Sequence, residues 1–230
     1  MSQKDYFNLG YRPYFVYRIL SHDIIMVNGP EHQFSFYAFK HFNLFQVAQV
    51  DNPGRQSILC ACESNDHIFV ATQGKHVFVL NKKTFTLMKA YSTLQLVTCL
   101  ERIDSPSGTI ILIGMQQKYF GSIKIMENSF DFEEIDLQQE VGHCLAFRQI
   151  VFDQLSQSFL VSHFGKKLEF WKIINFEDID SRQEVVHGRH LVMELANYWD
   201  RDVGILGQSG DYFICFDTIA KCFCVLNPTS

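Results

Sequence analysis

The amino-acid sequence predicts an all-β fold made of about five repeated units. The first observation is a pair of apolar segments joined by a short polar or glycine-containing turn, which occurs five times in the 230 residues. The pairs begin near Ile24, Ile68, Ile110, Phe159 and Val203, at steps of 44, 42, 49 and 44 residues. An all-β repeat of this length is typical of the four-stranded blades of a β-propeller.

The second observation is that the predicted strands are apolar on both faces. In the segment 76–81, Val77 and Val79 share one face, while Phe78 and Leu80 share the other. Strands of this kind fit sheets that are stacked face to face. The chain has 22 phenylalanines, which supply large side chains for packing between such sheets.

Each pair of segments has flanking strands that complete a four-stranded unit. The predicted inner strands are Tyr14–Leu20, Ser57–Glu63, Leu96–Ile103, Phe147–Asp153 and Leu191–Trp199. Predicted outer strands include Leu44–Val50, Thr86–Ser92 and Cys222–Leu226. The blades then span roughly 1–52, 53–93, 94–140, 141–186 and 187–230, within a single domain.

Turn and loop signals separate these strands. Asn28-Gly29-Pro30 and Ser105-Pro106-Ser107-Gly108 supply the backbone conformations that hairpin turns need. The segment Asp131–Val141 has a helix-forming composition, but we favour an outer strand followed by an acidic loop.

Sequence features indicate a reducing intracellular compartment. The chain starts without an apolar segment typical of secretion signals, has no usable glycosylation acceptor, and carries seven cysteines away from disulfide-framework spacings. We therefore expect a cytoplasmic location and free, buried thiols. The longest apolar runs are of strand length, so no membrane span is expected. A net charge of -5 without basic runs disfavours nucleic-acid and phosphoinositide binding.

The fourth repeat resembles the WD-repeat propeller family. The segment HFGKKLEFWKI is similar to the family's central hairpin, with Trp171 in the tryptophan place and Lys172 where an aspartate is usual. Gly142-His143 loosely matches the Gly-His pair that opens a family repeat. The other repeats lack the buried His–Asp–Ser/Thr–Trp network of the family, so apolar packing must hold them.

The resemblance also implies seven blades, whereas this chain supplies about five. Either five blades close into a ring, or the propeller is incomplete and another chain supplies further blades. An incomplete propeller would leave strand edges and an apolar face uncovered.

Carboxylates close four of the predicted inner strands, at Glu63, Glu101, Asp153 and Asp200. Some five-bladed propellers are glycosidases that use such carboxylates as acid and base. In the WD-repeat family, however, this place holds a polar turn. We favour turn residues, and therefore a protein that is not an enzyme.

The remaining candidate clusters favour structural roles. Cys60-x-Cys62, Cys222-x-Cys224 and His187-x-x-His190 provide enough ligand types for zinc, but at the wrong spacing. We interpret these cysteines as core residues and expect no metal or cofactor. Lys82-Lys83 and the histidines near turns, His163 among them, are expected to be solvated.

The sequence thus favours a non-catalytic protein–protein interaction scaffold or complex subunit, and the alternative is a glycan hydrolase. The resemblance implies that proteins or peptides bind on the rim made by second-to-third-strand turns and fourth-to-first-strand connections. The candidate binding residues in those turns are Glu31, His32, Lys75, His76, Gln116, Gln117, Lys118, Lys166, Lys167, Asp211 and Tyr212.

Overall fold

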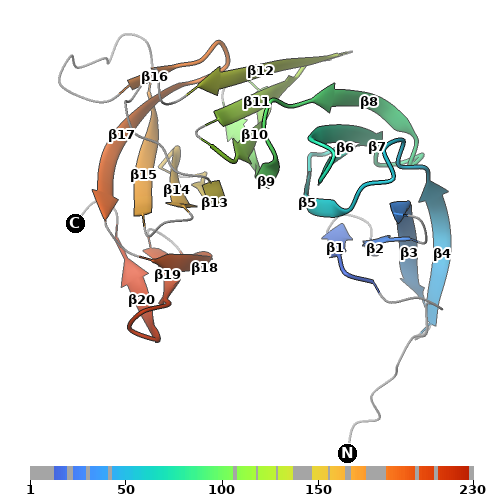
Figure 1. Cartoon of the computed structure of the whole chain (residues 1–230), viewed down its shortest axis with the longest axis horizontal. Helices are drawn as coiled ribbons and strands as arrows, with labels where there is room; N and C mark the ends of the chain where they lie inside the picture. The colour runs from blue at the N-terminus through green and yellow to red at the C-terminus, as the bar shows by residue number, and fades with distance from the viewer. Residues whose placement is uncertain are drawn as a thin grey trace, which may run out of the picture. The chain divides into compact units, whose positions relative to one another are not determined.

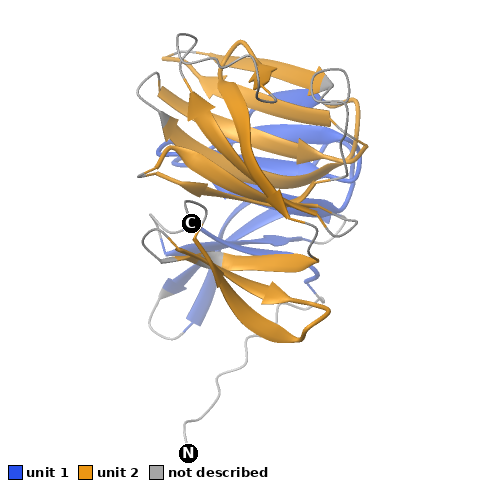
Figure 2. Ribbon diagram, turned by 90° about the vertical axis from the view of Figure 1, so that its left-hand side faces the viewer, with its two compact units in different colours: residues 1–92 blue, residues 93–230 orange. Residues whose placement is uncertain are grey.

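The computed structural model describes residues 13–19, 23–29, 32–40, 43–105, 108–117, 119–127, 129–136, 147–154, 156–163, 167–174, 185–199, 202–209 and 212–227. These ranges hold twenty β-strands in five antiparallel sheets (Figure 1). They contain no helix that is long and apolar enough to cross a membrane. The chain divides into two compact units, residues 1–92 and 93–230 (Figure 2).

Unit 1 contains two four-stranded sheets whose strands lie in chain order. The first sheet comprises β1 (Val16–Ile19), β2 (Ile24–Asn28), β3 (Phe34–Lys40) and β4 (Asn43–Val50). The second comprises β5 (Ile58–Glu63), β6 (His67–Thr72), β7 (His76–Asn81) and β8 (Leu87–Ser92). The two sheets share one apolar core, in which the rings of Phe34 and Phe78 lie 5.7 Å apart.

Unit 2 contains three sheets, of four, five and three strands. The four-stranded sheet comprises β9 (Val97–Ser105), β10 (Gly108–Met115), β11 (Tyr119–Ile125) and β12 (Phe130–Asp136). The five-stranded sheet has the order β13 (Phe147–Asp153), β14 (Ser158–His163), β15 (Lys167–Ile174), β17 (Val192–Trp199) and β16 (Val185–His187). The last sheet comprises β18 (Val203–Ser209), β19 (Tyr212–Asp217) and β20 (Cys222–Leu226). Strand β12 confirms the outer strand expected after residue 130, and residues 137–141 lie outside the described part.

The expectation that Leu191–Trp199 forms the inner strand of a fifth unit is wrong. This segment is β17, which pairs with β15 and places Leu195 opposite Trp171. Its two faces join two different apolar clusters, Met193 in one and Ala196 beside the other. A strand that is apolar on both faces fits both the inner place of a sheet and a place beside β15. Periodicity alone therefore did not distinguish these two places.

Strand β18 takes the inner place of the last sheet instead. The Arg148 guanidinium lies 3.3 Å from the Asp202 carboxylate, and the backbone N–H of Ile205 donates to Gln149 Oε1 at 3.2 Å. The residue numbers increase together from the first contact, Arg148–Asp202, to the second, Gln149–Ile205. Strand β18 therefore runs parallel to β13. Among the described residues, the last sheet therefore has an inner strand and two further strands.

Apolar packing between neighbouring sheets holds unit 2 together, as the phenylalanine surplus predicts. Phe120 lies 5.8 Å from Phe147 of the next sheet, and this contact lies in one cluster with Phe159 and Trp171, which are cross-strand partners within the five-stranded sheet. A separate cluster, which includes Phe170 and Phe213, joins the five-stranded sheet to the last one. Both faces of the five-stranded sheet are thus covered by apolar side chains.

Replacing Gly114 with alanine tests how tightly these sheets approach. A Cβ atom at this position in β10 would lie 2.4 Å from Cys99 Sγ and 2.8 Å from Phe147 Cβ. We expect Gly114→Ala to lower the free energy of unfolding by about 1–3 kcal/mol, because a packed core must shift to admit the methyl group. Denaturant unfolding followed by circular dichroism measures this change.

Gly204→Ala is the matched control, because its Cβ would meet only Arg148 Nη2, at 3.9 Å. This substitution should change stability by less than about 1 kcal/mol. Equal losses in the two variants would contradict the close packing at Gly114.

Candidate functional site

At one edge of unit 1, the β2–β3 and β6–β7 turns lie beside the connection between β4 and β5. Asn52 in this connection is 3% exposed, and its Nδ2 donates to the carbonyl oxygens of His32 (3.1 Å) and Gln56 (2.7 Å). The backbone N–H of Gln73, in the β6–β7 turn, donates to the Ser57 carbonyl at 2.9 Å. The connection is therefore bonded to both second-to-third-strand turns, as the family resemblance implied for the rim.

Three candidate residues, His32, Lys75 and His76, lie at this edge. His32 and Lys75 have positive φ angles of 63° and 57°, which fix the tight bends of the two turns. The His32 ring contacts the Tyr14 hydroxyl at 2.8 Å, and the His76 ring stacks on Phe78 at 5.8 Å. Lys75 remains exposed, and Glu31 lies outside the described residues.

A shallow pocket of about 190 Å³ opens beside these turns. It is lined by Gln33, Asp51, Asn52, Pro53 and Arg55. Gln33 Nε2 donates to Asp51 Oδ1 at 2.9 Å, so the pocket wall is internally bonded. A carboxylate and a guanidinium on one small hollow suit a polar side chain of a partner. The connection was expected at the rim but these residues were not, although Asp51-Asn52-Pro53-Gly54 is a turn signal.

In unit 2, Gln116 and Gln117 occupy the β10–β11 turn. The backbone N–H of Gln116 donates to the Leu96 carbonyl at 2.9 Å, so this turn meets the segment that precedes β9. Gln117 has a φ of 57°. Gln116 therefore matches Gln73 of the β6–β7 turn, and Gln117 shares the positive φ of Lys75, while Lys118 lies outside the described part.

The other two unit 2 candidates that the structure describes differ from the expectation. Lys167 has a side chain that is only 14% exposed, and its Nζ pairs with Glu169 Oε1 at 2.9 Å. Tyr212 follows the end of β18. Because β18 runs parallel to β13, Tyr212 lies at the opposite edge from Lys167. The structure does not bring these two residues together, and Lys166 and Asp211 lie outside the described residues.

Two of the predicted inner-strand carboxylates serve local structure. Glu63 pairs with Lys82 Nζ, which also donates to the Ser64 carbonyl at 2.9 Å. Lys82 is 3% exposed, so the expectation of a solvated lysine is wrong here. Asp153 is buried and accepts a hydrogen bond from Ser156 Oγ, as expected of a turn residue. Asp200 lies outside the described part of the chain.

Glu101 differs from these two, because it lies within β9 rather than at its end. Burial raises the pKa of its carboxyl to about 7, although the backbone N–H of Phe152 opposes this by donating to Oε1 at 3.3 Å. The turn role expected for Glu101 is therefore wrong. Its carboxyl sits in an apolar environment that favours the protonated form.

A buried charged cluster replaces the family's tryptophan–aspartate pair in the five-stranded sheet. Glu169 Oε2 accepts from Trp171 Nε1 at 3.0 Å and lies 2.9 Å from His163 Nε2. Burial alone would raise the Glu169 pKa, but the hydrogen bond and charge of His163, then those of Lys167, hold that pKa at about 2. His163 is buried, so the expectation that it is solvated is wrong. The acid lies two residues before the tryptophan instead of directly after it.

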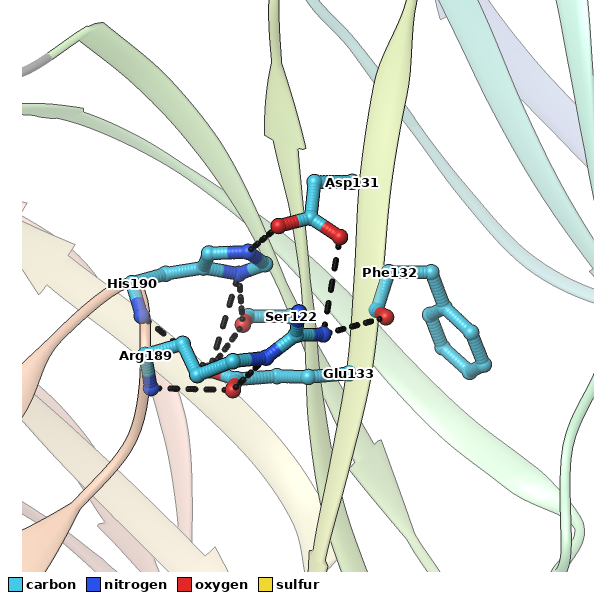
Figure 3. Close-up of polar contacts among 6 residues, drawn as sticks. All are labelled: Ser122, Asp131, Phe132, Glu133, Arg189 and His190. Carbon is cyan, nitrogen blue, oxygen red and sulfur yellow. Dashed lines mark hydrogen bonds and ion pairs between the residues drawn. The ribbon is translucent and has the colours of Figure 1, made fainter.

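A second polar cluster ties the four-stranded sheet to the β16–β17 turn (Figure 3). The His190 ring contacts Ser122 Oγ at 2.6 Å and Asp131 Oδ2 at 2.9 Å, while Ser122 Oγ donates to Glu133 Oε1 at 3.0 Å. Arg189 adds a backbone N–H to Glu133 Oε2 at 2.9 Å.

This cluster joins the four-stranded sheet to the five-stranded one. Serine, histidine and aspartate at hydrogen-bond distance also match a nucleophilic site, but Ser122 is only 1% exposed and its hydroxyl is used by Glu133. The hydrogen bond from His190, aided by the charge of Arg189, lowers the Asp131 pKa. No sequence signal pointed to the cluster, since Ser122 and His190 lie 68 residues apart.

The cysteines are all free thiols among the described residues. Cys62, Cys99 and Cys215 are buried, as expected, whereas Cys222 is exposed, so the core interpretation is wrong for Cys222. Cys144 lies outside the described residues. In the ranges that the structure covers, no group of three or more metal-ligating side chains is placed to hold a metal ion.

The low pKa of Glu169 predicts an acid-sensitive contribution to stability. The folded-state pKa is depressed from 4.5 to about 2. The contribution is therefore complete above about pH 4.5 and is lost as the pH falls toward 2. In Glu169→Gln, the free energy of unfolding should be lower at pH 7, and its difference from the wild type should shrink steadily below pH 4.5. Urea unfolding of both proteins across this pH range measures the difference in their free energies of unfolding. A difference that does not depend on pH would contradict the charged cluster.

The raised pKa of Glu101 predicts the opposite behaviour. Its folded-state pKa lies at about 7, above the ordinary 4.5. Between these two pH values, the folded state keeps the Glu101 proton while the unfolded state loses it. The free energy of unfolding therefore falls as the pH rises from about 4.5 to 7. Glu101→Gln should therefore unfold at a higher temperature than the wild type at pH 8 and at a similar temperature at pH 4.5. Thermal melts at both pH values provide the check, and a destabilised variant at pH 8 would refute the assignment.

Comparisons with known proteins show the fold. No family model matches the chain, and no curated protein matches it. The β-propeller domain of Cps50 (Swd1) from Myceliophteria thermophila is similar with a TM-score of 0.66 and 10% identity, over 90% of this chain and 66% of that one. BBS1N, solved in complex with ARL6DN, is similar with a TM-score of 0.61 and 8% identity, over 94% of this chain and 62% of that one.

The chain thus spans slightly less than two thirds of the lengths of these two structures. At this level of identity, the similarity concerns the path of the backbone and not the site. The repeated antiparallel sheets and these matches together show that the chain has the fold of a β-propeller.

Proposed function

We propose that the chain is a non-catalytic interaction module that binds a protein or peptide at the rim of unit 1. The observation that carries this proposal is the β4–β5 connection, which the buried Asn52 amide fixes against the β2–β3 turn. Binding loops held by a rigid scaffold are where proteins of this kind carry recognition residues. BBS1N, a structural neighbour, was itself solved with another protein bound.

The chemistry of this rim suits a polar protein surface. Asp51 and Arg55 are exposed in the lining of the pocket, and Lys75 is exposed in the β6–β7 turn, so the rim carries both signs of charge. A hollow of about 190 Å³ is smaller than typical small-molecule sites and accommodates one side chain of a partner. Charges at such a rim steer the encounter and select the partner rather than supply most of the affinity.

The alternative, a glycan hydrolase, is favoured by one observation. Glu101 has a pKa of about 7, in the range where a general acid works efficiently. Glu63 and Asp153, however, are engaged with Lys82 and Ser156, so neither supplies a second free carboxylate. Turnover of a panel of glycans that is abolished by Glu101→Gln would establish this alternative, and its absence in the wild type would end it.

The rim proposal is tested by removing its exposed charges. In the triple variant Asp51→Ala, Arg55→Ala, Lys75→Ala, partner capture should fall at least about tenfold, because rim charges guide recognition. The melting temperature should stay within about 2 °C of the wild type, since exposed substitutions change stability little. Affinity capture followed by quantitative mass spectrometry measures the loss for each protein that the wild type retains.

The matched control changes charges in the turns at the other edge of the same sheet. Asp66 in the β5–β6 turn and Lys83 in the β7–β8 turn form an exposed pair at 3.3 Å. The double variant Asp66→Ala, Lys83→Ala should retain capture. Equal capture by the rim variant and the wild type, or equal losses in the rim and control variants, would place the binding surface elsewhere.

A further inference from the structure

The β4–β5 connection of unit 1 holds a buried acceptor that has no hydrogen-bond partner. Asn52 is 3% exposed, and its Nδ2 donates to the carbonyl oxygens of His32 and Gln56. Because Nδ2 must face these two acceptors, the other end of the amide is Oδ1, and Oδ1 has no partner within the described part of the chain. An amide oxygen only accepts hydrogen bonds, and buried polar atoms rarely stay unpaired. The position of Asn52 Oδ1 therefore calls for a donor from a ligand.

The neighbouring β6–β7 hairpin carries two further atoms of this kind. His76 Nδ1 and the hydroxyl oxygen of Thr72 are buried, and neither has a hydrogen-bond partner among the described residues. Thr72 and His76 lie directly opposite one another in β6 and β7, so their side chains share one face of the sheet. In a neutral ring with its proton on Nε2, Nδ1 is an acceptor. Both residues can thus accept from the same ligand as Asn52.

The exposed side chain of Gln56 lies beside both groups of atoms. A Cβ atom added at Gly54 would lie 3.4 Å from Gln56 Cγ and 3.9 Å from Asn52 Oδ1. A Cβ atom added at Gly74 would lie 2.9 Å from Gln56 Cγ and 3.1 Å from His76 Nδ1. The Gln56 side chain therefore extends past two glycines, from the neighbourhood of Asn52 to that of His76. An exposed glutamine changes rotamer readily, so a ligand group can displace it and reach the atoms beside it.

The charges beside these acceptors favour a cation with several N–H donors. Asp51 is exposed and lines the pocket of about 190 Å³ together with Asn52, so its carboxylate adds a negative charge. Arg55 lines the same pocket and opposes a cation. Hydrogen bonds, rather than net charge, must therefore select the ligand. A guanidinium offers more donors than an ammonium and is more weakly hydrated, so an arginine side chain suits these acceptors better than a lysine side chain.

We propose that the rim of unit 1 binds an arginine-bearing segment of its protein partner, whose arginine displaces the Gln56 side chain. The guanidinium donates to Asn52 Oδ1 and to the Asp51 carboxylate, and His76 Nδ1 accepts a further N–H of the same segment. This inference rests on the rim binding proposed above and adds the chemistry of the partner. A segment with a lysine or a neutral side chain at this place is the competing occupant.

An amide NMR titration of the full chain with a short peptide tests this proposal. The peptide has a central arginine between glycines and is blocked at both ends. It should shift the amide signals of Gly54, Gln56 and Gly74. Replacing its arginine with citrulline, which keeps the shape but not the charge, should raise the dissociation constant by at least about tenfold. The corresponding lysine peptide should also bind more weakly than the arginine peptide.

Two variants of the chain test the acceptors. Asp51→Asn should weaken binding of the arginine peptide at least about fivefold, because it removes the charge while an oxygen remains for Gln33 Nε2. His76→Phe should weaken it about threefold or more, because it removes Nδ1 and keeps a ring to stack on Phe78. The matched control is Asp66→Asn at the other edge of the same sheet, which should leave the dissociation constant unchanged. Thermal melts confirm that each variant is folded.

Several results would overturn the arginine site. An arginine peptide that binds no more tightly than the citrulline or lysine peptide does so, as does binding that both Asp51→Asn and His76→Phe leave unchanged. Amide shifts confined to residues outside the rim also do so. If capture of a protein partner is lost in the triple rim variant but the arginine peptide shows no preference, rim binding stands and the arginine site is rejected. If the peptide binds selectively but capture survives in the triple variant, the arginine site stands and the rim is not the main partner surface.

Discussion

Two-sided burial of β-sheets is the constraint on which the rest of this structure depends. A sheet that is apolar on both faces is stable only if neighbours cover both, so each sheet needs the next. The five-stranded sheet of unit 2 meets this need with Phe159 and Trp171 on one side and Phe170 on the other. Such packing fixes the strands firmly and leaves the turns free to vary. The candidate binding residues therefore lie in turns and connections.

Apolar packing alone does not choose one arrangement of such similar sheets, and buried polar clusters add the necessary specificity. Glu169 is bonded to His163 and Trp171, so the hairpin of β14 and β15 must adopt one register to satisfy all three groups. His190 and Ser122 play a comparable role between sheets (Figure 3). An unpaired charge in either place would be costly, so the clusters disfavour alternative packings.

Much of the fold was predictable, because its signals are local. The apolar pairs anchored at Ile24 and Ile68 repeat at a nearly constant step, and the strands they predict are observed. The placement of Leu191–Trp199 was not predictable, because strand pairing depends on contacts between segments and not on periodicity. The buried state of Lys82 and His163 also escaped prediction, since both residues stand beside turn signals in the sequence. Their partners, Glu63 and Glu169, became evident only in three dimensions. The β2–β3 and β6–β7 turns were predicted from local signals, whereas the pocket beside Arg55 depends on how Asn52 folds the connection.

The three-stranded last sheet has a consequence for the way unit 2 opens. In stacked repeats, local stability follows from the number of neighbours that each element contacts. Sheet β18–β20 packs its Phe213 face on the five-stranded sheet, while Leu206 and Phe223 on its other face are exposed. Its hydrogen-bonded amides are thus protected by a single interface, whereas those of β14 are protected by two. Native-state hydrogen exchange would accordingly proceed as a gradient along unit 2, with β19 and β20 forming the first cooperative segment to be released.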